Sequence, residues 1–122
     1  MKLFLLLGAI NGFLAVAFGA FGAHGLEGKL SEKSLGQWEK AVNYQMFHTM
    51  ALFVTALLLG KATGGMFTGA GWFFFAGILL FSGSLYVYAV TGVKALAMIT
   101  PFGGVAFLIG WVLLGYASMK LL

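Results

Sequence analysis

The chain of 122 residues is 61% hydrophobic and only 8% charged, with a mean hydropathy of +1.02. Soluble domains are about 45–50% apolar and about 25% charged. The composition therefore excludes a soluble globular domain, a disordered chain and a nucleic-acid-binding module, and it indicates an integral membrane protein. The net charge of +4 comes from lysines scattered singly between apolar runs, without arginine, so no nucleic-acid partner is expected. The absence of cysteine excludes disulfides, iron–sulfur clusters and Cys-ligated zinc.

Four stretches between the charged residues are long enough to cross a bilayer. A spanning helix needs ~20 mostly apolar residues, because the hydrocarbon core is ~30 Å thick. The predicted spans are about 3–23, 41–60, 72–91 and 101–120. The sequence therefore predicts an all-α, transmembrane four-helix bundle that forms a single integral membrane domain over residues 1–122.

The first span carries a stripe of small residues with 4-3-4-3 spacing, which lie on one helical face. Small residues let helices approach closely in lipid, where hydrophobicity drives little association. Similar stripes follow in the third and fourth spans. The predicted packing glycines are Gly8, Gly12, Gly19, Gly22, Gly83, Gly103 and Gly110. The alternative is that glycines open a substrate path. Because three stripes exceed what one bundle obviously needs, we also expect a homo-oligomer.

The segment 24–40 contains all three glutamates and three of the seven lysines. It is predicted to be a solvated loop followed by a helical extension of the second span, capped by Ser34 and continuing through Trp38. A dedicated binding loop is the alternative. Lysines number three on the side of the two termini and four on the opposite side, so the positive-inside rule does not set the orientation.

The second half of the chain has clear helix boundaries. The turn 61–65 and the nearby glycines predict that the third helix begins near Trp72 and stops at Gly92. Thr100 is predicted as an N-cap, followed by Pro101 at the first helical position. Trp111 falls near mid-membrane, and we expect it to pack inside with its indole N–H bonded.

Polar residues at membrane depth are the candidate functional residues, because burying them is costly. Tyr44, Gln45 and His48 share one face of the second span. In the structural interpretation, a neutral His48 donates a hydrogen bond to a neighbouring helix and locks the bundle. In the functional interpretation, it relays protons or contacts a ligand. Metal binding is a third possibility, although the spans contain no carboxylate or thiolate to share the ion.

The third span adds a compact polar insertion whose hydroxyls could bond their own helix or could reach Gln45 and His48. The complete candidate network is Asn11, His24, Tyr44, Gln45, His48, Ser82, Ser84 and Tyr86. A haem shared by the two histidines is disfavoured, because His24 is expected at the interface and His48 well below it. A Ser–His nucleophile lacks an acid to orient the histidine. No cofactor and no metal are expected.

Four motifs in order resemble a known family over nearly the whole chain. They are Gly19-Ala20-Phe21-Gly22-Ala23-His24-Gly25-Leu26, then Trp38 with Tyr44-Gln45 and His48, then Phe81-Ser82-Gly83-Ser84-Leu85-Tyr86, and finally Ile99-Thr100-Pro101-Phe102-Gly103-Gly104 with Gly110-Trp111. The chain resembles the YgdD/YwdK-like family of small bacterial inner-membrane proteins, a domain of unknown function. The resemblance implies four spans, both termini in the cytoplasm, and a supporting rather than catalytic role. It supplies no catalytic residues.

The leading functional hypothesis is a non-enzymatic multi-pass protein of the bacterial inner membrane that supports membrane integrity or interacts with a partner. Its expected partners are membrane lipids, an unidentified protein and further copies of itself. The alternative is a small transporter or channel subunit with a polar path around His48. An intramembrane enzyme is the weakest hypothesis, since acid–base chemistry needs a suitable pair of titratable groups.

Overall fold

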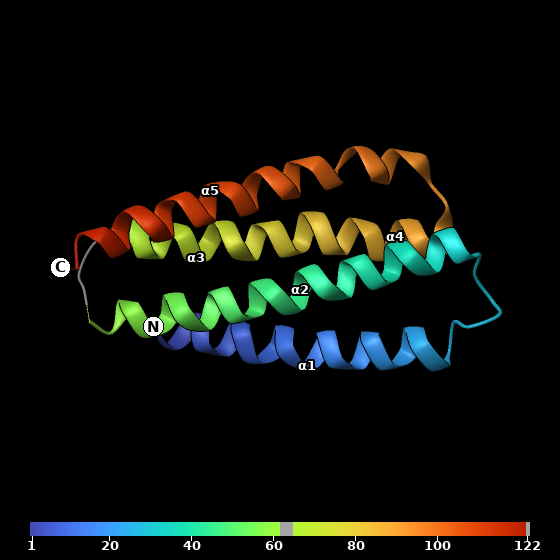
Figure 1. The fold of residues 1–122 in the computed structure, drawn as a ribbon, viewed down its shortest axis with the longest axis horizontal. Coiled ribbons are helices and arrows are strands. Elements are labelled where there is room, and N and C mark those ends of the chain that lie inside the picture. Colours follow the sequence, from blue (N-terminus) through green and yellow to red (C-terminus); the bar gives the residue numbers. More distant parts are fainter. Residues whose placement is uncertain (62–64, 122) are drawn as a thin grey trace.

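The computed structural model describes residues 1–61 and 65–121, which form helices joined by short connections, with no strand among these residues. Four helical segments are long and apolar enough to cross a membrane: Lys2–His24, Glu32–Leu59, Gly65–Thr91 and Lys94–Met119. They run up and down side by side, and the first begins at the end of the bundle where the last one finishes (Figure 1). The expected all-α four-helix fold is confirmed. The predicted turn at 61–65 falls largely on residues 62–64, which lie outside the described residues.

α1 (Lys2–His24) and α2 (Glu32–Leu59) form the first hairpin. The prediction that Ser34 caps α2 is wrong, because Ser31 is the N-cap and its Oγ accepts the backbone N–H of Ser34 at 3.1 Å. Ser31 has extended backbone angles, as an N-cap residue requires. Glu32 follows it in the first turn, where its negative charge interacts favourably with the positive end of the helix dipole. α2 therefore starts well before the predicted span, as the expected extension through Trp38 requires.

The third helical segment consists of α3 (Gly65–Gly77), the π-helical turn η1 (Ile78–Ser82) and α4 (Gly83–Thr91). It begins at Gly65 rather than near the predicted Trp72. Phe67 and Ala70 in this additional stretch are buried, so tertiary packing outweighs the poor helix propensity of the glycines. The segment ends where predicted, at Gly92, whose positive φ of 70° lets its N–H bond the carbonyl of Tyr88.

The π turn changes the role predicted for one glycine. A Cβ added at Gly83 would meet only the Ile78 carbonyl oxygen of its own segment, at 4.0 Å, so Gly83 does not pack against another helix. A π turn contains one additional residue, which rotates everything after it by about 100° relative to an α-helix. The regular α-helical spacing that placed Gly83 on the predicted packing stripe therefore no longer applies.

The last segment combines the 3-10 turn η2 (Lys94–Met98) with α5 (Thr100–Met119). Pro101 lies in the first turn of α5, as predicted, but the N-cap is Ile99 and not Thr100. The Thr100 hydroxyl instead lies 2.6 Å from the hydroxyl of Ser84 on α4. It therefore connects two helices rather than capping one.

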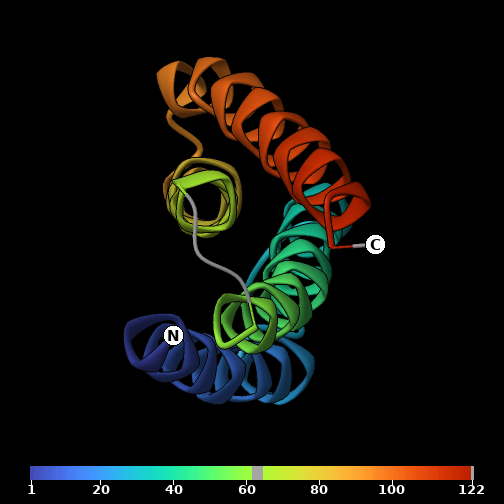
Figure 2. The same ribbon diagram turned by 90° about the vertical axis from the view of Figure 1, so that its left-hand side faces the viewer.

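The helices pack in pairs, α1 on α2 and α3 on α5, and α2 also contacts α3 and α4. Seen from the end, α1 and α5 lie at opposite edges of the bundle (Figure 2). The main core lies around the fully buried Phe74 and Leu52. A second cluster, which includes Trp38 and Leu26, closes the end that carries the α1–α2 connection.

Candidate functional site

The face of α2 that meets α1 is closed by glycines. Four of the predicted packing glycines of α1 each face a side chain of α2: Gly8 faces Phe53, Gly12 faces Thr49, Gly19 faces Val42 and Gly22 faces Trp38. A Cβ added at Gly22 would lie 2.5 Å from the Trp38 ring. The indole N–H of Trp38 in turn donates to the Phe18 carbonyl of α1 at 2.8 Å. The two helices therefore approach closely along their whole shared length.

Three of the predicted polar residues form one chain of hydrogen bonds that crosses this interface and continues to α4. The Gln45 side-chain amide donates to Asn11 Oδ1 at 3.0 Å, and the Tyr86 hydroxyl donates to Gln45 Oε1 at 2.7 Å. Asn11 also donates to the Leu7 carbonyl at 2.8 Å. Asn11 and Gln45 are each 4% exposed. This chain, the Asn11–Gln45–Tyr86 network, ties α1, α2 and α4 together.

His48 belongs to a second, separate group on the part of α2 that is turned toward α5. Its Nε2 accepts the indole N–H of Trp111 at 3.0 Å, and its Nδ1 lies 2.8 Å from the Tyr44 carbonyl. An indole nitrogen only donates and a carbonyl only accepts, so the neutral imidazole with its proton on Nδ1 is the form that satisfies both contacts. The ring also stacks on Phe107, with centroids 3.5 Å apart.

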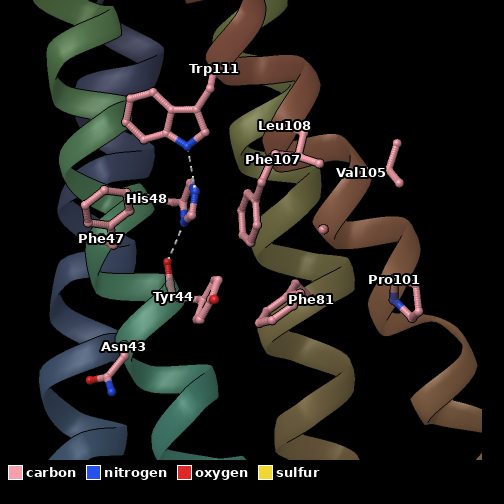
Figure 3. A pocket seen from close by; sticks show the side chains of 11 residues that line it. Asn43, Tyr44, Phe47, His48, Phe81, Pro101, Val105, Phe107, Leu108 and Trp111 are labelled. Carbon is pink, nitrogen blue, oxygen red and sulfur yellow. Dashed lines mark hydrogen bonds between the residues drawn. The ribbon is translucent and has the colours of Figure 1, made fainter.

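His48 does connect two helices, as the structural interpretation predicts, but the predicted direction of the hydrogen bond is wrong. The histidine donates within its own helix and receives the bond from the neighbouring one (Figure 3). Trp111 has its N–H bonded, as expected, but the residue is 37% exposed rather than packed inside. A proton relay through Nε2 has to break the Trp111 bond first.

The two serines bond elsewhere than to Gln45 or His48. Ser82 donates to the Ala41 carbonyl of α2 at 2.7 Å, and Ser84 bonds Thr100 and the Phe81 carbonyl. His24 lies exposed at the end of α1, outside both groups. The predicted residues therefore form separate ties between helices and not one continuous network.

The buried polar side chains of the described residues are satisfied by one another and by the backbone. Over residues 1–61 and 65–121, no buried side-chain nitrogen or oxygen lacks a hydrogen-bond partner. The same residues contain no group of three His, Cys, Asp or Glu side chains that could hold a metal ion. Some of these polar groups connect helices, as Gln45, Ser82 and Trp111 do. Others, such as Thr49 and Thr55, bond a carbonyl of their own helix.

Sequence reasoning missed a groove of about 750 Å³ between α2 and α5, which we call the α2–α5 groove. Figure 3 shows Tyr44 and Phe47 on the α2 side, Leu108 and Pro101 on the α5 side, and Phe81 of η1 between the two helices. The lining residues are Asn43, Tyr44, Phe47, His48, Phe81, Pro101, Gly104, Val105, Phe107, Leu108 and Trp111. The 3- and 4-residue spacing along one face of α5 was the available signal.

These features define a multi-span membrane protein, because four apolar helices carry their polar groups inward and expose large apolar side chains outward. The chain belongs to the family described as protein of unknown function (DUF423), which matches residues 18–104. Together with the relatives described next, this match confirms the expected membership in the YwdK-like family.

Relatives of this chain carry names that agree with this class. The UPF0382 membrane protein YwdK of Bacillus subtilis is 55% identical over the full length of both chains. The UPF0382 membrane protein SERP0230 of Staphylococcus epidermidis is 54% identical, and SAB0533 of Staphylococcus aureus is 52% identical, each over 98% of both chains. No solved structure matches the chain. The prediction of a membrane protein of unknown activity is confirmed.

Proposed function

We propose that this protein is a non-enzymatic component of the bacterial cytoplasmic membrane that supports membrane integrity or a partner complex. The observation that carries the proposal is the complete pairing of its buried polar groups among the described residues. An enzyme or a polar conduction path needs polar atoms that are free to meet a substrate. Here the Asn11–Gln45–Tyr86 network and the His48–Trp111 pair use those atoms to hold helices together.

The cytoplasmic membrane is proposed because four apolar helices suit it, whereas proteins of the bacterial outer membrane are β-barrels. We propose that both termini lie in the cytoplasm, on the basis of the family resemblance, since the lysine count does not decide the orientation. Single cysteines at Lys2 and Gly28, labelled on intact cells with an impermeant maleimide, test this. Labelling of K2C but not of G28C would reverse the proposed orientation.

The proposed partners are the surrounding lipids, an unidentified protein and further copies of the chain. The glycines of α1 are used against α2 within one chain, so any association must use outer faces. The exposed Phe13 of α1 and Val112 of α5 are examples of side chains available there. Cross-linking in native membranes tests the association, and recovery of monomers alone would remove the homo-oligomer from the proposal.

A deletion strain tests the function. We expect it to admit more of an impermeant dye than the parent strain does under membrane stress, and we expect the wild-type gene to restore the barrier. Variants that weaken the polar ties, Q45L and W111F, should complement in proportion to the folded protein present in the membrane. A variant present at the wild-type level that fails to complement would indicate chemistry or transport at that residue and would contradict the proposal.

A further inference from the structure

The α2–α5 groove has the depth of one leaflet of a bilayer. Along α5 it extends from Pro101, where the predicted fourth span begins, to Trp111. These residues are about ten positions apart, which corresponds to ~15 Å at ~1.5 Å per residue. The hydrocarbon core is ~30 Å thick. The groove therefore begins at the membrane surface on the side of the α1–α2 connection and ends near the middle of the membrane.

The inner end of the groove is closed by a specific contact. Trp111 reaches from α5 across to α2, where its N–H donates to His48 (Figure 3). Phe47 lies against the Trp111 ring, with centroids 5.6 Å apart. A partner's transmembrane helix needs ~20 residues to cross the whole core. An occupant that enters from the surface and stops halfway fits this shape better than such a helix does.

The walls of the groove differ between its two ends. Val105, Leu108 and the aromatic rings provide an apolar wall toward the inner end, whereas the side chain of Asn43 lies near the outer end. Lys40, one helical turn before Asn43, is exposed on the same side of the membrane. The groove thus offers hydrocarbon contacts in depth, with an amide and a cation near its mouth.

We propose that the α2–α5 groove binds one acyl chain of a phospholipid from the leaflet on the side of the α1–α2 connection. The chain lies along Val105 and Leu108 with its end near Trp111, and its polar head lies near Asn43 and Lys40. In a bilayer the surrounding solvent is hydrocarbon, and an empty groove forfeits the dispersion contacts of its whole lining. This inference goes beyond the proposed supporting role, because lipid binding in the groove does not depend on which complex the protein supports.

A quinone is a poorer fit than an acyl chain. At the inner end of the groove a quinone ring would need hydrogen-bond donors, but both His48 nitrogens there are already bonded. Tyr44 stacks on Phe81, and His48 stacks on Phe107, so these aromatic faces are occupied by one another. The remaining surface suits a flexible apolar chain.

Photolabelling of the full chain in lipid vesicles tests the proposal. The vesicles contain phosphatidylethanolamine and phosphatidylglycerol with a trace of a phospholipid that carries a diazirine midway along one acyl chain. Mass spectrometry of the labelled protein should find adducts concentrated on Val105 and Leu108 over the exposed Phe13 of α1. Moving the diazirine toward the headgroup should shift the adducts toward Pro101, and moving it toward the chain end should shift them toward Trp111. This profile needs no variant.

Two matched substitutions on α5 then test the groove, one that fills it and one that lies outside it. Gly104 lines it, and an added Cβ there would make only ordinary contact with Phe81, at 3.9 Å, so G104L should fold and occupy the space. We expect G104L to reduce labelling of Leu108 about tenfold, which corresponds to ~1.4 kcal/mol. G115L is the control, because an added Cβ at Gly115 on the same helix meets nothing within 4 Å and Gly115 does not line the groove.

Three results would overturn the proposal. Even labelling of Val105, Leu108 and Phe13, with no dependence on diazirine position, would mean ordinary surrounding lipid. Efficient disulfide cross-linking of two L108C chains, but not of two F13C chains, would assign the groove to a second copy. Stoichiometric quinone extracted from protein purified from native membranes would assign it to that class.

Discussion

The two faces of α2 differ sharply in how closely they meet their neighbours. Toward α1, glycines stand opposite Trp38 and Phe53, and the helices close on each other. Toward α5, the facing residues include Leu108 and Trp111, which hold the helices apart and leave a groove of about 750 Å³. The comparison shows that the placement of glycine decides which helix pairs pack tightly in this bundle.

Two glycines of α5, Gly103 and Gly110, are directed toward the third segment rather than toward α2. Gly103 faces the backbone of Phe81, and Gly110 faces the ring of Phe74 at 2.8 Å from an added Cβ. α5 is therefore anchored on α3 and η1, and its contact with α2 depends on long side chains. Substitutions that add a side chain at a glycine, or that remove a hydrogen bond between helices, test this comparison directly.

The largest effect is expected for Gly103→Ala. The added Cβ would collide with the backbone of Phe81, which cannot move aside as a flexible side chain can. Overpacking costs ~1–3 kcal/mol, and a backbone clash belongs at the upper end, so we expect a loss of about 3 kcal/mol in the free energy of unfolding. Unfolding in mixed micelles with increasing denaturing detergent measures it.

The neighbouring Gly104→Ala is the matched control for this prediction. Gly104 faces the groove, where an added Cβ makes only ordinary contact. Replacing a helical glycine by alanine should then stabilise the protein by about 0.5–1 kcal/mol. If the two substitutions gave equal losses, the distinction between a closed and an open face of α5 would not hold.

The second prediction concerns the closed side of α2. Gln45→Leu removes two hydrogen bonds and leaves Asn11 and Tyr86 without their partner. Leaving a buried polar group unsatisfied costs ~1–3 kcal/mol, so we expect a loss of about 2 kcal/mol in the same assay. Tyr86→Phe added to Gln45→Leu should cost less than it does alone, because the shared bond is already gone. Full additivity would mean that the network is not formed.

A third, smaller effect is expected on the open side. Trp111→Phe removes the hydrogen bond that His48 Nε2 accepts, which joins α5 to α2. Interhelical bonds in membranes average ~0.6 and reach ~1.7 kcal/mol, so we expect a loss of about 1 kcal/mol. Nitrogen-15 NMR of the His48 ring should show a neutral imidazole with its proton on Nδ1 in the wild type. A proton on Nε2 would contradict the assigned pair.

Much of the fold could be predicted from the sequence, because hydrophobic run length and glycine spacing are local properties. The four helices, the stop at Gly92 and the position of Pro101 follow from such signals. The start of the third helix could not be predicted, since the burial of Phe67 and Ala70 depends on helices far away in the chain. The π turn likewise changes the face of Gly83 without a local signal that sequence spacing can detect.

The polar residues could be listed from the sequence, but their pairing could not. The hydroxyls of the third span were predicted either to bond their own helix or to reach Gln45 and His48. Tyr86 does reach Gln45, whereas Ser82 bonds a backbone carbonyl of α2. Which partner each side chain meets depends on helix rotation, and one residue of π-helical insertion alters that rotation. The groove escaped prediction for a related reason, because it is made by two helices that are distant in sequence.

The smallest effect is expected at the mouth of the α2–α5 groove. Thr100→Val removes the hydroxyl pair with Ser84, which connects α4 to the start of α5. Thr100 is half-buried near the predicted membrane surface, where water can replace the lost partner, so we expect a loss of about 0.6 kcal/mol. Thr55→Val is the control, because the Thr55 hydroxyl bonds the Ala51 carbonyl of its own helix, and the substitution should be nearly neutral. Equal losses of stability in the two variants would mean that the hydrogen bond between helices contributes no more than a hydrogen bond within one helix. The start of α5 would then be held by its glycine contacts alone.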